Sequence, residues 1–110
     1  MTRQSLGAVI DRLSETIEAR KSADPNSSYT AQLLSKGTDH CARKFGEEAI
    51  EAIIAAAAGD PEDLAAETGD VIYHLLVTIA AGGVSPDDVA AALSAREGTS
   101  GLEEKAARKG

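Results

Sequence analysis

Residues 44–76 read KFGEEAIEAIIAAAAGDPEDLAAETGDVIYHLL, two apolar segments that are separated by the sequence GDP at 59–61. Five of their acidic residues form two groups, which are Glu47, Glu48 and Glu51 in the first segment and Glu67 and Asp70 in the second. Residues three apart lie on the same side of an α-helix, so each segment presents a pair of neighbouring carboxylates. If the segments form antiparallel helices, four carboxylates converge, and like charges at that distance need a counterion. The stretch therefore predicts a helical hairpin that binds a hard divalent cation through oxygen ligands.

The composition of the chain favours an all-α fold. Aromatic residues make up 3% of the 110 residues, so the core must consist mainly of Ala, Leu, Ile and Val. Small aliphatic side chains suit close packing of helices better than a β-sandwich. A chain of this length forms one domain, residues 1–110. Its net charge of -7 repels a polyanion, so we expect no nucleic-acid partner.

Apolar spacing predicts four main helices and a short one. The main helices span residues 6–21, 38–58, 61–81 and 86–96, and a short helical segment spans 30–35. Short connections make successive helices antiparallel neighbours, so we expect an antiparallel helical bundle. Within the domain, residues 1–27 form an N-terminal helix and loop, and residues 97–110 form a basic C-terminal tail.

Capping residues mark the ends of these helices. Ser5 and Thr38 are suitable N-caps, and Gly59 suits the left-handed position that follows helix 38–58. The sequences DPED at 60–63 and SPDD at 85–88 combine a capping residue, a proline and acids near the positive end of the helix dipole. They predict the starts of helices 61–81 and 86–96.

Cysteine content and apolar segments indicate where the protein works. The chain has one cysteine, Cys41, which cannot form an intrachain disulfide, and its N-terminal residues have no signal-peptide core. The most apolar run, 71–84, is shorter than the roughly 20 residues that a membrane span needs. These features predict a cytoplasmic protein with no membrane partner.

The apolar surface of helix 61–81 also indicates the oligomeric state of the protein. This helix is apolar nearly all round, so we expect it to be deeply buried. Three other short helices cannot cover that much apolar surface. We therefore expect the bundle to be completed in a homodimer.

Other interpretations of the acidic residues remain open. They suit the solvated faces of amphipathic helices, although no basic residue lies between Glu47 and Asp70 to pair with them. A ferritin-like di-iron site needs Glu-x-x-His motifs, and neither Glu48 nor Glu67 has a His three residues later. His74 follows Asp70 by four residues and suits either the site or the core. All-oxygen ligation favours Mg²⁺ or Mn²⁺ over iron.

The acidic spacing resembles a known signature. Glu47-Glu48-x-x-Glu51 followed by Glu67-x-x-Asp70 is similar to the E-E-x-x-E and E-x-x-D motifs of the MazG-like all-α nucleotide pyrophosphohydrolases. Flanking segments carry the resemblance further, namely SYT at 28–30, KFGEEA at 44–49, DVIYHLL at 70–76 and SGLEEKAAR at 100–108. Together they resemble the phosphoribosyl-ATP pyrophosphatase family of histidine biosynthesis.

The resemblance implies a reaction and a set of site residues. The reaction is hydrolysis of phosphoribosyl-ATP to phosphoribosyl-AMP and pyrophosphate, with Mg²⁺ or, as a substitute, Mn²⁺. The implied metal ligands are Glu48, Glu51, Glu67 and Asp70, and Glu47 is implied to orient or deprotonate the attacking water. The expected substrate-binding residues are Lys36, Lys44, His74, Arg96, Lys105 and Arg108.

Some alternatives stay open beside this resemblance. Lys44 precedes Glu48 by four residues and can form a surface ion pair with it instead of binding phosphate. The superfamily signature also fits a housecleaning hydrolase of free nucleoside triphosphates. A non-enzymatic helical interaction module is the third possibility.

Overall fold

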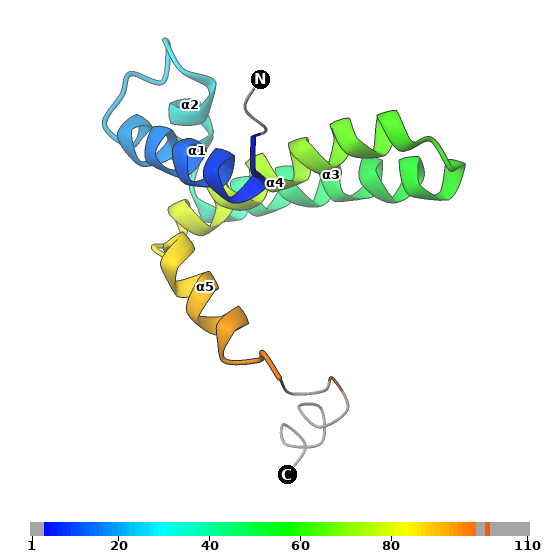
Figure 1. The fold of residues 1–110 in the computed structure, drawn as a ribbon. Helices are drawn as coiled ribbons and strands as arrows, with labels where there is room; N and C mark the ends of the chain where they lie inside the picture. The colour runs from blue at the N-terminus through cyan, green and yellow to red at the C-terminus, as the bar shows by residue number, and fades with distance from the viewer. Residues whose placement is uncertain (1–3, 99–100, 102–110) are drawn as a thin grey trace.

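The computed structural model describes residues 4–98 and 101, and it contains five α-helices and no strand within that part of the chain (Figure 1). The helices are α1 (Leu6–Arg20), α2 (Tyr29–Ser35), α3 (Thr38–Ala58), α4 (Pro61–Ala81) and α5 (Pro86–Ser94). The prediction of an all-α fold is confirmed.

Local capping explains where four of the helices begin. The side chains of Ser5, Ser28, Asp60 and Ser85 each accept a hydrogen bond from a backbone N–H in the first turn of their helix. At α5 the arrangement is reciprocal, because the Asp88 carboxylate accepts from the Ser85 N–H at 2.9 Å. These hydrogen bonds lower the pKa of Asp88 below its usual value. The predicted starts of α1, α4 and α5 are therefore confirmed.

The start of α3 differs from its prediction. Gly37, with φ 92°, is the N-cap and provides no side-chain hydrogen bond, so the assignment of Thr38 as the cap was wrong. Thr38 is instead the first helical residue, and its hydroxyl donates to the Ala81 carbonyl at 3.1 Å. That bond ties the beginning of α3 to the end of α4.

Helices α3 and α4 form the antiparallel hairpin that the sequence predicts, and they lie side by side in Figure 1. Gly59 ends α3 in the left-handed conformation at φ 72°, which a residue with a side chain rarely adopts. Asp60 then caps α4, so the chain reverses within two residues. The tight reversal fixes which residues of the two helices face each other.

The core lies at one end of this hairpin. Its buried members are Ile17, Leu33, Cys41, Leu76 and Val77. They bring α1 and α2 against the beginning of α3 and the C-terminal half of α4. The rest of the hairpin extends beyond α1 and α2 (Figure 1), and Ile50, Ile53 and Ile54 are exposed there.

Helix α4 is less buried than expected. His74, Leu76 and Val77 are its buried residues, whereas Leu64 and Leu75 are exposed. The prediction of deep burial was therefore wrong for a single chain, because α1 and α2 cover only the C-terminal half of α4. Among the described residues, α4 is also long and apolar enough to cross a membrane by length and composition, a test that core helices of soluble proteins pass as well.

Helix α5 does not return along α4. It ends at Ser94 rather than near Arg96, and it points away from the hairpin (Figure 1). None of its nine residues, all of which the structure describes, is buried. A short connection keeps successive helices close in the chain but does not set their angle, and Gly83, at φ 77°, redirects the backbone here.

Candidate metal centre and active site

Three carboxylates from the two helices of the hairpin meet at one place. Glu48 from α3 and Glu67 and Asp70 from α4 each offer an oxygen atom, and these oxygens all lie within 4.8 Å of one another. Glu48 and Glu67 are partly buried, and Asp70 is exposed. Oxygen atoms bound to Mg²⁺ lie about 2.0–2.1 Å from the ion, so small side-chain rotations suffice for all three to share one cation. The all-oxygen donor set and its spacing fit a hard divalent metal.

Glu51, the fourth predicted ligand, is not part of this closely spaced group. It is exposed on α3, one helical turn after Glu48. Its carboxylate still acts on the site, because its negative charge contributes to raising the pKa of Glu67. The structure thus brings together three of the four predicted ligands and places the fourth beside them.

The electrostatics of the group favour a cation. Loss of hydration raises the pKa of Glu67 above its usual value, and so do the neighbouring carboxylates, which are Asp63, Asp70, Glu51 and Glu48 in order of decreasing effect. Both causes disfavour the ionised form of Glu67. A divalent cation between the carboxylates reverses the effect of their mutual repulsion, because it attracts each negative charge and so favours the ionised form of Glu67.

Lys44 pairs with Glu47 rather than with Glu48. The Lys44 Nζ lies 3.1 Å from Glu47 Oε2, and this contact is the main reason that the pKa of Lys44 is raised. The charge of Glu48 makes a smaller contribution in the same direction. Glu47 is exposed beside the carboxylate group, with Lys44 as its partner.

The other predicted substrate-binding residues have different positions. Lys36 is the exposed C-cap of α2, just before α3 begins. Glu48 lies about 15 Å along the α3 axis from the first residue of that helix, so Lys36 is far from the carboxylate group. Arg96 is exposed beyond the end of α5. Lys105 and Arg108 lie outside the described residues. His74 is buried against Glu48, with its Nε2 atom 4.0 Å from Glu48 Oε1.

Sequence reasoning missed the surroundings of His74. The rings of Tyr73 and Tyr29 meet the imidazole edge-on, at centroid distances of 5.0 and 6.3 Å. The hydroxyl groups of Tyr73 and Thr30 are hydrogen-bonded at 2.5 Å, and burial raises the pKa of Tyr73. The sequence signal for these contacts was the segment SYT at 28–30. It is part of the family resemblance, but the sequence alone assigned it no structural role.

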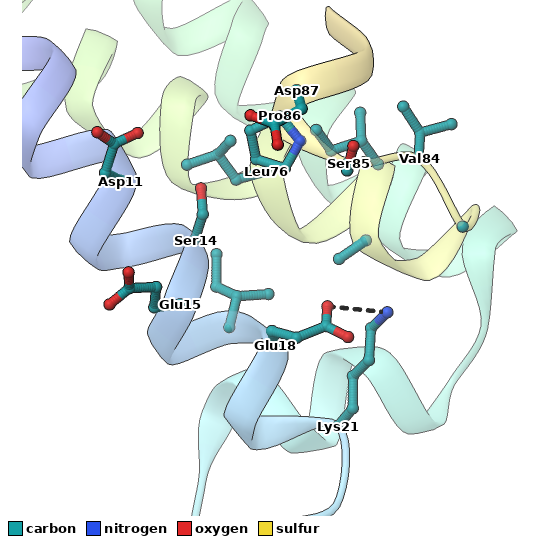
Figure 2. Close-up of a pocket in the computed structure, with 14 residues that line it drawn as sticks. Asp11, Ser14, Glu15, Glu18, Lys21, Leu76, Val84, Ser85, Pro86 and Asp87 are labelled. Carbon is teal, nitrogen blue, oxygen red and sulfur yellow. Dashed lines mark ion pairs between the residues drawn. The ribbon is translucent and has the colours of Figure 1, made fainter.

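A hollow elsewhere in the molecule contains none of the predicted site residues. It has a volume of about 580 Å³ and lies between α1, the end of α4 and the start of α5. Figure 2 shows Asp11, Ser14 and Glu15 along one side and the Glu18–Lys21 ion pair at the edge. In this pair Lys21 Nζ lies 3.1 Å from Glu18 Oε2. The sequence did not predict this hollow, because its shape depends on how α1 crosses α4.

Comparison with known proteins agrees with the geometry of the hairpin. A family model described as phosphoribosyl-ATP pyrophosphohydrolase matches residues 10–97. The chain belongs to this family. A phosphoribosyl-ATP pyrophosphatase of Cereibacter sphaeroides is 61% identical, covering 91% of this chain and 97% of the relative. Proteins of the same name from Jannaschia sp. and Ruegeria pomeroyi are 60% and 58% identical, covering 90% and 92% of this chain and 97% and 96% of the relatives. The family match spans all three grouped carboxylates and His74.

Proposed function

We propose that this chain hydrolyses phosphoribosyl-ATP to phosphoribosyl-AMP and pyrophosphate, the second step of histidine biosynthesis. The observation that carries the proposal is the identity of 58–61% with phosphoribosyl-ATP pyrophosphatases over at least 90% of the chain. The group of Glu48, Glu67 and Asp70 supports it, because hydrolysis of a phosphoanhydride needs a cation to balance phosphate charge. The enzyme works in the cytoplasm, in keeping with its one cysteine and its nucleotide substrate.

The metal in this proposal is Mg²⁺, with Mn²⁺ as a substitute that takes the same oxygen ligands. Glu48, Glu67 and Asp70 would hold it, and Glu51, one turn after Glu48 on α3, would join them. When bound, the ion supplies positive charge to the phosphate oxygens and to the departing pyrophosphate. Glu47 is the residue that orients or deprotonates the water, since its carboxylate is beside the group but not within it.

The reaction adds water to the α-phosphorus and breaks the bond to the oxygen that bridges to the β-phosphate. Binding an anionic substrate to a protein of net charge -7 requires local cations. The proposed phosphate-binding residues are Lys36, Lys44, Arg96, Lys105 and Arg108. Lys44 has the strongest structural support, because its ion pair with Glu47 holds it next to the carboxylate group.

The test of this function is the release of pyrophosphate from defined substrates. We expect phosphoribosyl-ATP with Mg²⁺ to be the preferred substrate, and we expect EDTA to abolish the release. ATP and deaminated nucleoside triphosphates serve as comparison substrates. Preference for a free triphosphate would replace this function with that of a housecleaning hydrolase. No release from any substrate, together with no thermal stabilisation by Mg²⁺, would leave only a non-catalytic interaction module.

We also propose that the enzyme is a homodimer. Ile50, Ile53 and Ile54 are spaced to lie on one side of α3, and all three are more than half exposed in the single chain. Leu64 and Leu75 on α4 are exposed as well. Soluble proteins rarely leave contiguous apolar surface of this kind to water, and a twofold dimer covers it on both copies at once.

Replacing Ile53 by lysine is expected to convert the dimer to a monomer. The side chain is 65% exposed in the single chain, so the charge harms the fold little but is costly within an apolar interface. Light scattering during gel filtration at micromolar concentration measures the mass. Leu6→Lys is the matched control, because Leu6 is 63% exposed on α1 and should leave the dimer intact. A monomeric wild-type protein would contradict the proposal.

A further inference from the structure

His74 is a buried polar residue whose hydrogen bonds are incomplete. It is 6% exposed, and its Nδ1 atom has no hydrogen-bond partner among the residues that the structure describes. The other ring nitrogen, Nε2, faces Glu48 Oε1 at 4.0 Å. An unsatisfied polar atom in the interior costs about 1–3 kcal/mol, so a buried imidazole in this position calls for an explanation.

The imidazole is held from two helices. Tyr73, its neighbour on α4, and Tyr29 from α2 both approach it edge-on. Tyr73 is in turn fixed by the hydroxyl of Thr30 on α2. The backbone of His74 is bonded as well, because the Thr78 hydroxyl donates to its carbonyl at 2.7 Å. His74 is therefore a rigid group, whereas the Glu48 side chain has more rotatable bonds and is more exposed.

The imidazole of His74 can act as a hydrogen-bond donor to the Glu48 carboxylate. A neutral imidazole with its hydrogen on Nε2 directs that hydrogen at the carboxylate and leaves only a lone pair on the buried Nδ1. The 4.0 Å separation is about 1 Å longer than a hydrogen bond, a gap that a rotation of the flexible Glu48 side chain closes. The ring is buried, so it has little surface with which to contact a phosphate.

We propose that His74 is a positioning residue, which donates a hydrogen bond from Nε2 to Glu48 and orients that carboxylate for metal binding. The inference rests on the proposed function, because it takes Glu48 to be a metal ligand. Hydrogen bonds to carboxylate ligands fix their orientation, and their loss typically costs about 10–100-fold in metal affinity or activity. His74 would thus act through Glu48 and not through contact with the substrate.

Binding of Mn²⁺ without substrate, followed by electron paramagnetic resonance, tests this role independently of turnover. We expect His74→Leu, which has no donor, to raise the Kd of Mn²⁺ by about 10–100-fold. His74→Gln keeps an N–H donor at the same number of bonds from Cβ, and its Kd should stay within about threefold of wild type. His40→Leu is the matched control, because it removes the other histidine of the chain, which lies on α3 about two helical turns before Glu48.

A double variant separates positioning from a purely structural role. In the Glu48→Gln background, His74→Leu should weaken Mn²⁺ binding by less than about twofold, because the group that it orients has lost its charge. If His74→Leu does not fold, as judged by circular dichroism, His74→Met replaces it, since methionine has a similar volume and also lacks the donor.

The outcomes distinguish this inference from the proposal on which it rests. Wild-type affinity in His74→Leu, or a His74→Gln variant as weak as His74→Leu, overturns the positioning role and leaves the metal site in place. A wild-type protein that does not bind Mn²⁺ overturns the metal site and the positioning role together. Weakening in His74→Leu, rescue in His74→Gln and no change in His40→Leu support the inference.

Discussion

Replacing Glu48 by glutamine is expected to lower the turnover of phosphoribosyl-ATP by at least about 100-fold and to leave the helices folded. The change keeps the shape of the side chain but removes one of three charges whose oxygens lie within 4.8 Å of one another. Asp70→Asn should have an effect of the same order for the same reason. The measurement is kcat at saturating Mg²⁺, with circular dichroism to verify the fold.

Glu62→Gln is the matched control for this pair of variants. Glu62 is an exposed acid in the first turn of α4 and is outside the carboxylate group, so its loss changes the net charge by the same amount. Its turnover should remain within about threefold of wild type, since an exposed charge outside the group is largely screened. Near-normal turnover by both Glu48→Gln and Asp70→Asn would rule out the proposed ligand roles.

Much of the hairpin was predictable because its determinants are local. Gly59, Asp60 and Pro61 specify the reversal between α3 and α4 through backbone conformation and capping, and neither depends on distant contacts. Helical spacing then places Glu67 and Asp70 on one side of α4. Once the hairpin forms, these two acids meet the acidic side of α3, which carries Glu48 and Glu51.

The features that the sequence did not predict depend on three-dimensional offsets. Periodicity places Glu48 and Glu51 on the same side of α3, but the stagger between the helices decides which of them meets α4 most closely. Threonine is a common N-cap residue, yet the Thr38 hydroxyl donates to the carbonyl of Ala81, 43 residues later in the chain. The direction of α5 likewise follows from one glycine conformation, at Gly83, and from no periodic pattern.

Among the substitutions proposed for this chain, Leu33→Ala should lower the free energy of unfolding the most. Leu33 is 2% exposed and packs in the core that joins α2 to α1, α3 and α4. Truncation of such a side chain costs about 2–5 kcal/mol, a large part of the roughly 5–15 kcal/mol that stabilises a typical domain. Urea unfolding at a fixed protein concentration measures the loss, because the stability of a dimer depends on concentration.

The consequences of this truncation extend to the site through α2. With seven residues, α2 is too short to be stable alone, so Leu33 and Ala31 anchor it, and the Cys41 thiol donates to the Leu33 carbonyl at 3.2 Å. The same helix carries Tyr29 and Thr30, which fix Tyr73 and the ring of His74. Leu6→Ala is the control, since Leu6 is 63% exposed and its truncation should change the free energy of unfolding by no more than about 0.5 kcal/mol. If Leu33→Ala cost no more than Leu6→Ala, α2 could not be the element that holds the tyrosines in place, and the rigidity of His74 would need another source.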